Sequence, residues 1–210
     1  MSFAVAIDGP AAAGKGTIAR VIADHFGLEY LDTGLLYRFV GRARLEGAQD
    51  LAEIARTIES GDLKHVDLRA PAVSQAASEV AKMPEVRSAL MALQRRFAKI
   101  PKGAVLDGRD IGTVICPEAD VKLYVFANRE VRAKRRHLEL TANGLDIPFE
   151  KVLSDLQVRD CLDMERSEAP LRPADDALKL DTSELTVDDA NQRAIALVTA
   201  QLNKGGNLSH

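Results

Sequence analysis

The chain has 210 residues, of which 28 are lysine or arginine and 31 are aspartate or glutamate, for a formal net charge of −3. This length suffices for one soluble domain with a buried core, and the near-neutral charge excludes a protein that coats a nucleic acid polymer through bulk basic charge. Two cysteines and four histidines support neither a disulfide framework nor a structural zinc site. No apolar run reaches the roughly 18 residues of a membrane span and no signal-peptide core opens the chain, so we expect a cytoplasmic protein.

The first predicted elements are a strand, a glycine-containing loop and a helix. The apolar, β-branched run Phe3–Ile7 is typical of a strand that is buried on both faces. Apolar residues then recur at helical spacing from Gly16 until Gly27 ends the pattern. A weaker strand candidate over 28–31 is followed by a helix over 35–40.

Residues 47–86 are poor in large apolar groups and are cut by two prolines, so we predict a mostly helical excursion from the core. The buried-strand pattern then returns. Strands are predicted over 103–106, 121–126 and 177–180, and helices over 130–140, 149–165 and 187–202, before a frayed tail over 203–210. Strands that alternate with helices predict an α/β fold with a parallel sheet of about five strands, helices on both faces and ligands at the carboxyl ends of the strands.

A phosphate-binding loop is predicted after the first strand. The sequence G-x-x-x-x-G-K-G-T stands between a buried strand and the start of a helix, which is where such a loop belongs. Lys15 supplies a cation for the β and γ oxygens of a nucleotide, and the Thr17 hydroxyl is a ligand for Mg²⁺. The alternative is a glycine-rich turn with an incidental lysine. The predicted ATP-binding residues of the loop are Gly9, Pro10, Ala11, Ala12, Ala13, Gly14, Lys15, Gly16 and Thr17.

A second strand end supplies a carboxylate. The small and apolar residues 104–106 are followed by Asp107, which we predict to hold magnesium through a water molecule. The alternative is an aspartate that only caps the following turn. The expected cofactor is therefore Mg²⁺, with ATP as the phosphoryl donor.

Two of the predicted helices carry arginines that could meet phosphate. Five cations and one acid lie between Arg129 and Arg136, a local charge of +4 in a chain whose total is −3. On the next helix Arg159, Asp163 and Arg166 stand at i, i+4 and i+7, so all three can face one ligand. Phosphoryl transfer needs such positioned cations. The alternatives are a solvated basic face on the first helix and a surface ion pair between Arg159 and Asp163 on the second.

These motifs resemble those of the bacterial cytidylate kinases, within the nucleoside monophosphate kinase family of P-loop kinases. The resemblance runs in order along nearly the whole chain, and it is most specific in L-D-T-G-x-x-Y-R at 31–38 and D-G-R-D-I-G-T at 107–113. It implies the P-loop kinase fold with a helical acceptor-binding domain and a short helical lid. It also implies transfer of the ATP γ-phosphoryl group to CMP or dCMP.

The resemblance implies roles for further residues. The implied catalytic residues are Lys15, Arg109, Arg132 and Arg159. The implied lid contacts to the phosphates or adenine of ATP are Arg132 and Arg136. Cytosine is implied to meet Ser78, Arg87 and Asp110, whose hydrogen-bonding groups complement those of the base. The sugar and phosphate of the acceptor are implied to meet Thr33, Tyr37, Arg38, Arg109, Arg159, Asp163 and Arg166.

The resemblance also divides the chain into a core domain of residues 1–37, 101–127 and 167–210, an acceptor domain of residues 38–100, and a lid with its adjoining helix over 128–166. The segment before Ser78 is shorter than in relatives that carry a small additional sheet there, and it lacks alternating strand signals. We therefore predict a compact, mostly helical acceptor domain. We expect a monomer with no nucleic acid polymer or membrane as partner.

Three other functions compete with this interpretation. A kinase of another small molecule, such as shikimate, would share the fold and Lys15 but would not need Ser78, Arg87 and Asp110 together. A GTP-dependent switch protein would carry an Asn-Lys-x-Asp motif, which the sequence lacks. A non-catalytic nucleotide-binding regulator would tolerate the loss of the lid arginines, which the sequence retains.

Overall fold

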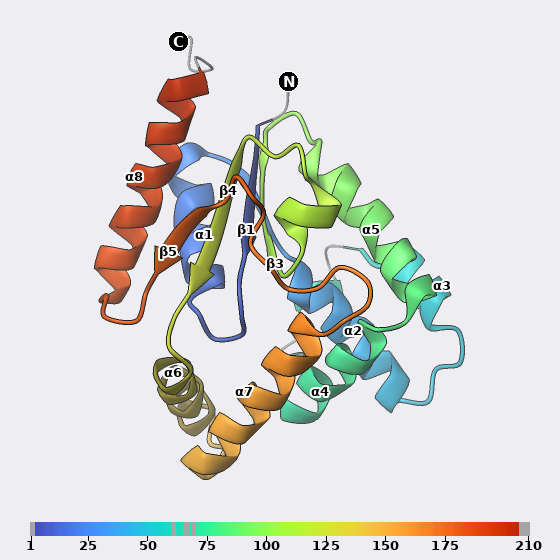
Figure 1. Ribbon diagram of the computed structural model, residues 1–210. Helices are drawn as coiled ribbons and strands as arrows, with labels where there is room; N and C mark the ends of the chain where they lie inside the picture. The colour runs from blue at the N-terminus through green and yellow to red at the C-terminus, as the bar shows by residue number, and fades with distance from the viewer. Residues whose placement is uncertain (1–2, 60–61, 65–67, 69, 206–210) are drawn as a thin grey trace.

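A five-stranded, all-parallel sheet forms the centre of the protein (Figure 1). The computed structural model describes residues 3–59, 62–64, 68 and 70–205. The strands lie in the order β2-β3-β1-β4-β5, so consecutive strands are joined by crossovers, as the alternation of strands and helices predicts. Their bounds are β1 Ala4–Asp8, β2 Glu29–Asp32, β3 Ala104–Gly108, β4 Val121–Phe126 and β5 Leu178–Asp181.

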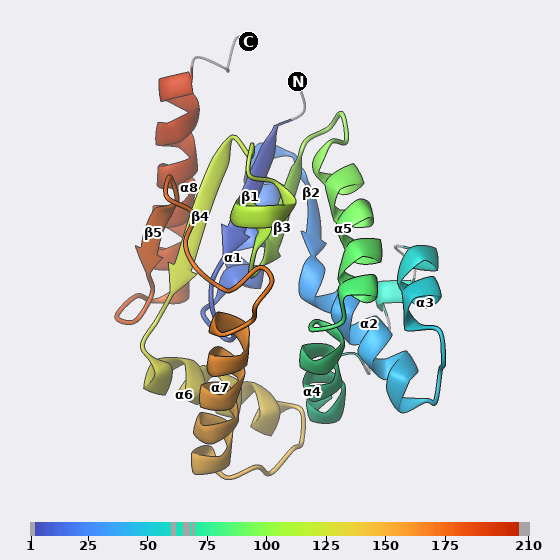
Figure 2. The same cartoon turned by 45° about the vertical axis from the view of Figure 1, so that its right-hand side comes forward.

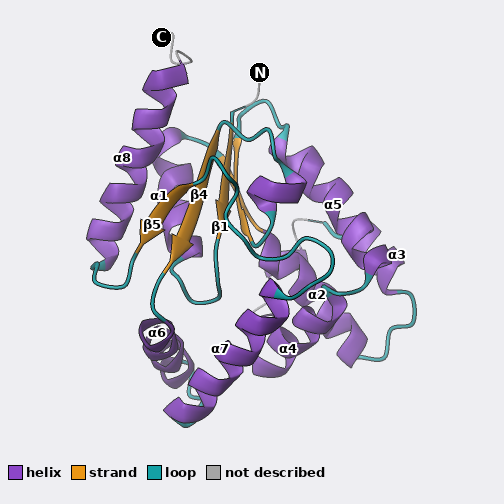
Figure 3. Cartoon of the chain, viewed as in Figure 1, coloured by secondary structure: helices purple, strands orange, loops and turns teal. Residues whose placement is uncertain are grey.

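Helices cover both faces of this sheet (Figure 3). On one face α1 (Lys15–Phe26) and α8 (Val187–Gly205) pack against Val5 and Ile7 of β1. On the other face α2 (Thr33–Leu45) and α5 (Pro84–Ala98) pack against the alternate residues of the same strand, Ala4 and Ala6. Every residue of β1 is buried, because both of its faces are covered, and for this reason the strand reads as a continuous apolar run.

The segment between β2 and β3 is helical wherever the structure describes regular elements in it. It contains α2, α3 (Leu51–Thr57), a 3-10 turn at Asp62–Lys64, α4 (Pro71–Val80) and α5. The helices α2 and α4 pack closely, since a Cβ atom on Gly41 would lie 2.7 Å from the backbone nitrogen of Ala77. The predicted mostly helical character is thus confirmed for the described residues, while 60–61, 65–67 and 69 lie outside them. The predicted domain boundaries stay predictions.

Two further helices lie beyond the carboxyl ends of the strands, facing α4 (Figure 2). They are α6 (Arg129–Ala142) and α7 (Phe149–Met164), and they share a small apolar cluster of Ala133, Leu140, Val152 and Leu156. This pair corresponds to the predicted lid and its adjoining helix. The open end of the sheet therefore lies between α2 and α4 on one side and α6 and α7 on the other.

Two segments differ from the sequence-based expectations. The predicted frayed tail is wrong for Asn203–Gly205, which continue α8, while 206–210 lie outside the described residues. A π-helical turn at Ile111–Ile115, directly after β3, was not predicted.

Among the residues that the structure describes, no helix has both the length and the apolar character needed to cross a bilayer.

Candidate active site

Three strand ends bring acidic residues to one edge of the sheet. Asp32 at the end of β2 lies beside Asp107 of β3, and Asp8 at the end of β1 lies beside Gly108. A cavity of about 350 Å³ opens at this edge. The predicted site residues that line it are Ala11, Ala12, Ala13, Gly14, Lys15, Gly16, Thr17, Thr33, Tyr37, Arg38, Ser78, Asp107, Arg109, Asp110, Arg136, Arg159, Asp163 and Arg166. Those that do not line it are Gly9, Pro10, Arg87 and Arg132.

The phosphate loop leaves β1 in close contact with β4. A Cβ atom on Gly9 would lie 1.9 Å from the carbonyl oxygen of Val125, and Gly9 has a φ of +148°, so only glycine fits. Gly14, in the left-handed conformation, then caps α1. The Lys15 ammonium at the start of α1 is buried and donates to the carbonyl oxygen of Pro10 at 2.8 Å. The loop therefore places the lysine on the floor of the cavity.

The carboxylate of the predicted magnesium site is Asp107. Its Oδ2 accepts a hydrogen bond from the hydroxyl of Tyr30 at 3.3 Å, and its backbone carbonyl accepts from Thr33 Oγ1 at 2.6 Å. Burial, reinforced by the neighbouring carboxylate of Asp32, raises the pKa of Asp107 to about 7. A divalent cation would relieve this unfavourable placement of negative charge. The hydroxyl of Thr17 lines the same cavity, so the oxygen donors present suit Mg²⁺.

Binding of ATP is expected to protonate Lys15. Burial, together with the guanidinium of Arg109, lowers the pKa of Lys15 to about 7, so at pH 8 the unliganded amine is mostly neutral. The phosphates of ATP favour the charged form and raise this pKa, so about one proton should be taken up per ATP bound at pH 8, and fewer at pH 6. Calorimetric titration of ATP in buffers of different ionisation enthalpy, with EDTA present, measures this number.

The matched control for this titration is Lys15→Arg. An arginine stays charged throughout this pH range, so the variant should take up almost no proton. Equal proton uptake by both proteins would show that Lys15 is already charged before ATP binds.

The helix α7 directs three charged side chains at the cavity, as their spacing predicts. Asp163 does not pair with Arg159, which was the alternative from the sequence; instead Asp163 Oδ2 accepts from Arg109 Nε at 2.7 Å. Buried nitrogens of Arg159 and Arg166 have no hydrogen-bond partner among the described residues. Burial and the neighbouring Arg109 lower the pKa of Arg159 to about 9. Buried donors without partners indicate an anionic ligand at this wall of the cavity.

A buried ion pair holds Asp110, which lines the cavity. Arg87 Nη2 of α5 donates to Asp110 Oδ2 at 2.6 Å, and Arg87 Nη1 donates to the Tyr37 hydroxyl at 3.4 Å. Asp110 lines the cavity, whereas Arg87 lies behind it and orients the carboxylate. Ser78 of α4 also lines the cavity, and its hydroxyl donates to the carbonyl of Ser74. The sequence predicted these residues together but not the pairing of Arg87 with Asp110.

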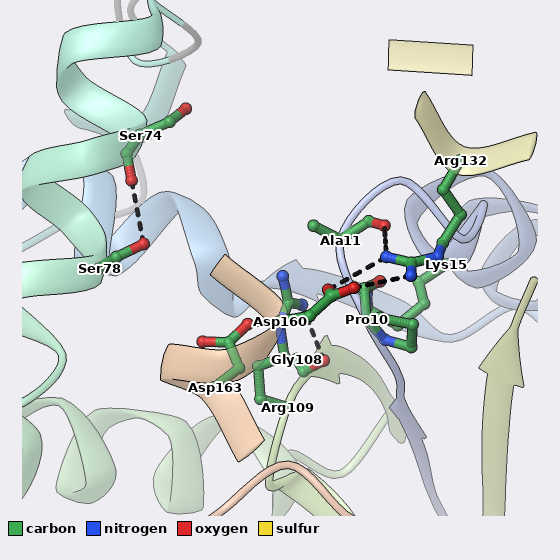
Figure 4. A network of polar contacts seen from close by, with 10 residues as sticks. All are labelled: Pro10, Ala11, Lys15, Ser74, Ser78, Gly108, Arg109, Arg132, Asp160 and Asp163. Atoms are coloured by element: carbon green, nitrogen blue, oxygen red, sulfur yellow. Dashed lines mark hydrogen bonds and ion pairs between the residues drawn. The ribbon is translucent and has the colours of Figure 1, made fainter. Parts of the chain in front are cut away.

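Arg132 is buried and does not line the cavity, so its predicted contact with ATP stays a prediction. Figure 4 shows its contacts with Ala11 and Asp160. Its guanidinium donates to Asp160 on α7 at 2.7 and 3.1 Å, to the carbonyl of Ala11 in the phosphate loop at 3.2 Å and to the carbonyl of Ala127 at 2.9 Å. The competing partner, Asp160, stands 28 residues further along the chain, so no local pattern indicated it. Arg132 thus connects α6, α7 and the phosphate loop.

A second cavity of about 280 Å³ adjoins the same phosphate loop. It is bordered by Arg135 and Arg136 of α6 and by Thr182, which follows β5. Arg135 Nη1 donates to Thr182 Oγ1 at 2.9 Å, and Arg136 pairs with Glu139 at 2.9 Å. The two cavities share the residues 12–14 of the phosphate loop, so one extended ligand could occupy this cavity and reach the first.

Sequence reasoning missed several residues of the site. Tyr30 and Glu139 lie beside predicted site residues, and Arg135 and Thr182 border the second cavity. Arg135 lies in the predicted basic cluster 129–136 and the family resemblance covers Thr182, but neither was assigned a role. Tyr30 and Glu139 are indicated only by their nearness to the motifs. Asp8 directly precedes the phosphate loop, and no local pattern predicts its hydrogen bonds to the turn after Asp110.

The fold and the site together define the class. A P-loop kinase combines a phosphate loop at the end of a parallel sheet with a carboxylate beside the loop and a second ligand site lined by arginines. This protein has all three. Solved structures agree on the fold: a gluconokinase from Sinorhizobium meliloti 1021 superposes with a TM-score of 0.55 at 15% identity, covering 99% of this chain and 98% of that one. A sugar kinase from Janibacter sp. HTCC2649 gives a TM-score of 0.50 at 16% identity, covering 95% of each chain.

The chain belongs to the cytidylate kinase family. The family model for cytidylate kinase matches residues 5–200. The cytidylate kinase of Cereibacter sphaeroides (strain KD131) is 57% identical over 205 residues, covering 98% of this chain and 99% of that protein. The cytidylate kinase of Sinorhizobium medicae (strain WSM419) is 50% identical over 210 residues, covering 97% and 99%. The protein is therefore an enzyme, a nucleotide kinase.

Proposed function

We propose that this enzyme transfers the γ-phosphoryl group of ATP to CMP or dCMP, giving CDP or dCDP. The observation that carries the proposal is the pair of cavities that share the phosphate loop, one of them lined by arginines with unpartnered buried donors. Two polyanionic ligands that meet at one loop are what transfer between nucleotides requires. A cytoplasmic location, where both nucleotides are found, belongs to the same proposal.

The donor nucleotide occupies the second cavity and the phosphate loop. Adenine lies in the part of this cavity that Arg135, Arg136 and Thr182 border, and the triphosphate follows the loop to Lys15. Thr17, and Asp107 through water, would hold Mg²⁺, which neutralises charge on the phosphate oxygens when bound. Arg132 does not contact ATP in this proposal, since its guanidinium already holds the loop carbonyl of Ala11.

The acceptor nucleotide occupies the first cavity. Its phosphate meets Arg38, Arg109 and Arg159, and Asp163 with Arg166 meets the ribose. Thr33 and Tyr37 complete this wall of the cavity. The base reaches Ser78 and Asp110, with Arg87 behind them. The Ser78 hydroxyl donates to an acceptor of cytosine once it turns away from the carbonyl of Ser74, and the Asp110 carboxylate can accept from the amino group of the base.

The chemistry needs no side chain as a general base. An oxygen of the acceptor phosphate, already ionised near neutral pH, attacks the γ-phosphorus in line, and the bond from that phosphorus to the β–γ bridging oxygen breaks to release ADP. Lys15, Arg109 and Arg159 stabilise the negative charge that spreads over the moving group. The helices α6 and α7 flank the cavity and shield it from water, which favours transfer over hydrolysis.

A panel of acceptors tests the proposed substrate. With ATP and Mg²⁺ the purified enzyme should phosphorylate CMP and dCMP well, UMP poorly, and AMP or GMP hardly at all. The physical reason is that cytosine carries an amino group for Asp110 where uracil carries a carbonyl oxygen, while the larger purine rings present a different shape to the same contacts. A coupled assay of ADP release measures all five rates, and AMP as the best acceptor would overturn the base assignment.

Replacement of Asp110 by asparagine should weaken base selection. The amide keeps the shape and one oxygen for Arg87, but it removes the charge and turns a donor toward the amino group of cytosine. We expect the ratio of kcat/KM for CMP over UMP to fall by about tenfold or more, with the KM for ATP unchanged. An equal rise in the KM for CMP and in the KM for ATP would instead show that Asp110 has a purely structural role.

A further inference from the structure

The π-helical turn Ile111–Ile115 directly follows Arg109 and Asp110, and its amino end is capped from another strand. The side chain of Asp110 is turned toward Arg87 and does not cap the turn. The carboxylate of Asp8, at the end of β1, takes its place. Its Oδ1 accepts from the backbone nitrogen of Ile111 at 2.8 Å and its Oδ2 from that of Gly112 at 2.7 Å.

A residue of α5 holds the other end of the same turn. Arg95 Nη2 donates to the carbonyl of Val114 at 2.9 Å and Arg95 Nε to that of Ile115 at 3.2 Å. An anion therefore sits at the amino end and a cation at the carboxyl end, the arrangement that complements the dipole of a helical turn. Both ends are held by side chains from elements that carry other parts of the site.

The surroundings of Asp8 show that this cap is tightly built. Asp8 is 4% exposed, and a Cβ atom on Gly112 would lie 3.2 Å from the side chain of Lys122 and 3.4 Å from Asp8 itself. Burial raises the pKa of Asp8 to about 6 although both N–H groups act to lower it, so placing a carboxylate there carries a cost. Asp8 also immediately precedes the phosphate loop.

We propose that Asp8 and Arg95 are positioning residues for the acceptor nucleotide: by clamping the turn Ile111–Ile115 they hold Arg109 and Asp110 in place. Neither side chain lines the cavity, so each acts through the turn and not by touching substrate. This clamp, which is the set of hydrogen bonds from Asp8 and Arg95 to the turn, also connects β1, which leads into the phosphate loop, with α5, which carries Arg87. This inference rests on the proposed function of Arg109 and Asp110 as acceptor contacts.

Arg95 offers the sharper test, because its side chain is exposed and its loss should leave the fold intact. Arg95→Ala should raise the KM for CMP by about five- to tenfold, because it removes two charge-assisted hydrogen bonds to the turn. The KM for ATP should stay within about twofold of the parent. Arg95→Lys keeps a cation that can reach one carbonyl, so it should recover part of the loss.

The matched control is Arg96→Ala. It removes the same charge from the next position of α5. Arg96 is exposed, and its side chain makes no hydrogen bond or ion pair among the described residues. Its KM for CMP should equal that of the parent. The proposed clamp would be wrong if Arg95→Ala had the same KM for CMP as Arg96→Ala. It would also be wrong if Arg95→Ala raised the KM for ATP as much as the KM for CMP.

Asp8→Asn tests the other end of the turn. The amide nitrogen would face a backbone N–H, so we expect a rise of at least about tenfold in the KM for CMP together with a lower melting temperature. If this variant does not fold, the Arg95 series alone decides. A parent enzyme that prefers another acceptor would overturn the proposed function. The positioning role of Asp8 and Arg95 would then be tested by assaying the Arg95 and Arg96 variants with that acceptor.

Discussion

Lys15→Met is expected to lower kcat by at least about a hundredfold, because a preorganised cation in a site shielded from water is worth some 3 kcal/mol to the transition state. Lys15 is the cation that the phosphate loop itself presents to the cavity, where it donates to Pro10. The methionine keeps the apolar stem and removes only the charge. A coupled assay at saturating ATP and CMP measures the loss, and unchanged turnover would rule out the phosphate-loop mechanism.

The same variant should be at least as stable as the parent. The pKa of Lys15 falls from its ordinary 10.5 to about 7 on folding, so between these pH values the unfolded chain binds more protons than the folded one and stability rises with pH. Methionine cannot be protonated, so the variant avoids the free-energy cost of burying an amine whose pKa is lowered. A melting temperature equal to or above that of the parent at pH 7 shows that lost activity is not lost folding, and Lys99→Met, an exposed lysine at the end of α5, serves as the control with full activity.

Asp160→Ala is expected to lower the free energy of unfolding by about 3 to 5 kcal/mol, because it leaves the Arg132 guanidinium buried without its counter-ion. Both side chains of this pair are 6% exposed. Urea unfolding followed by circular dichroism measures the change. Asp155→Ala is the matched control on the same helix, since the pair of Asp155 with Lys151 is more than half exposed and should contribute less than about 1 kcal/mol.

A double variant separates the structural role of Arg132 from a role in ATP binding. Arg132→Met with Asp160→Leu removes both charges, so no unpaired charge remains, and most of the stability lost in Asp160→Ala should return. If the only role of Arg132 is to connect α6, α7 and the phosphate loop, the KM for ATP should stay within about threefold of the parent. A stable double variant with a much higher KM for ATP would support the predicted contact of Arg132 with ATP.

Much of the fold could be predicted from sequence because it follows from local pattern. β1, the phosphate loop and α1 succeed one another within 26 residues, and their periodicity and glycines indicate each of them. The predicted strand over 121–126 matches β4, and the three charged residues of α7 share one face because their spacing alone requires it. The π-helical turn at Ile111–Ile115 has no such local signal, since it depends on distant caps.

The sequence by itself determined the class of protein, the phosphate loop and the set of side chains that gather at the strand ends, because motif spacing and hydrophobic period are local properties. Only the tertiary structure decided which charges pair. Asp163 pairs with Arg109 across 54 residues, Asp160 with Arg132 across 28 and Asp8 with the turn after Asp110 across more than 100. A buried charge takes the partner that folding brings within reach, and that distance is set by the packing of whole elements rather than by neighbours in the chain.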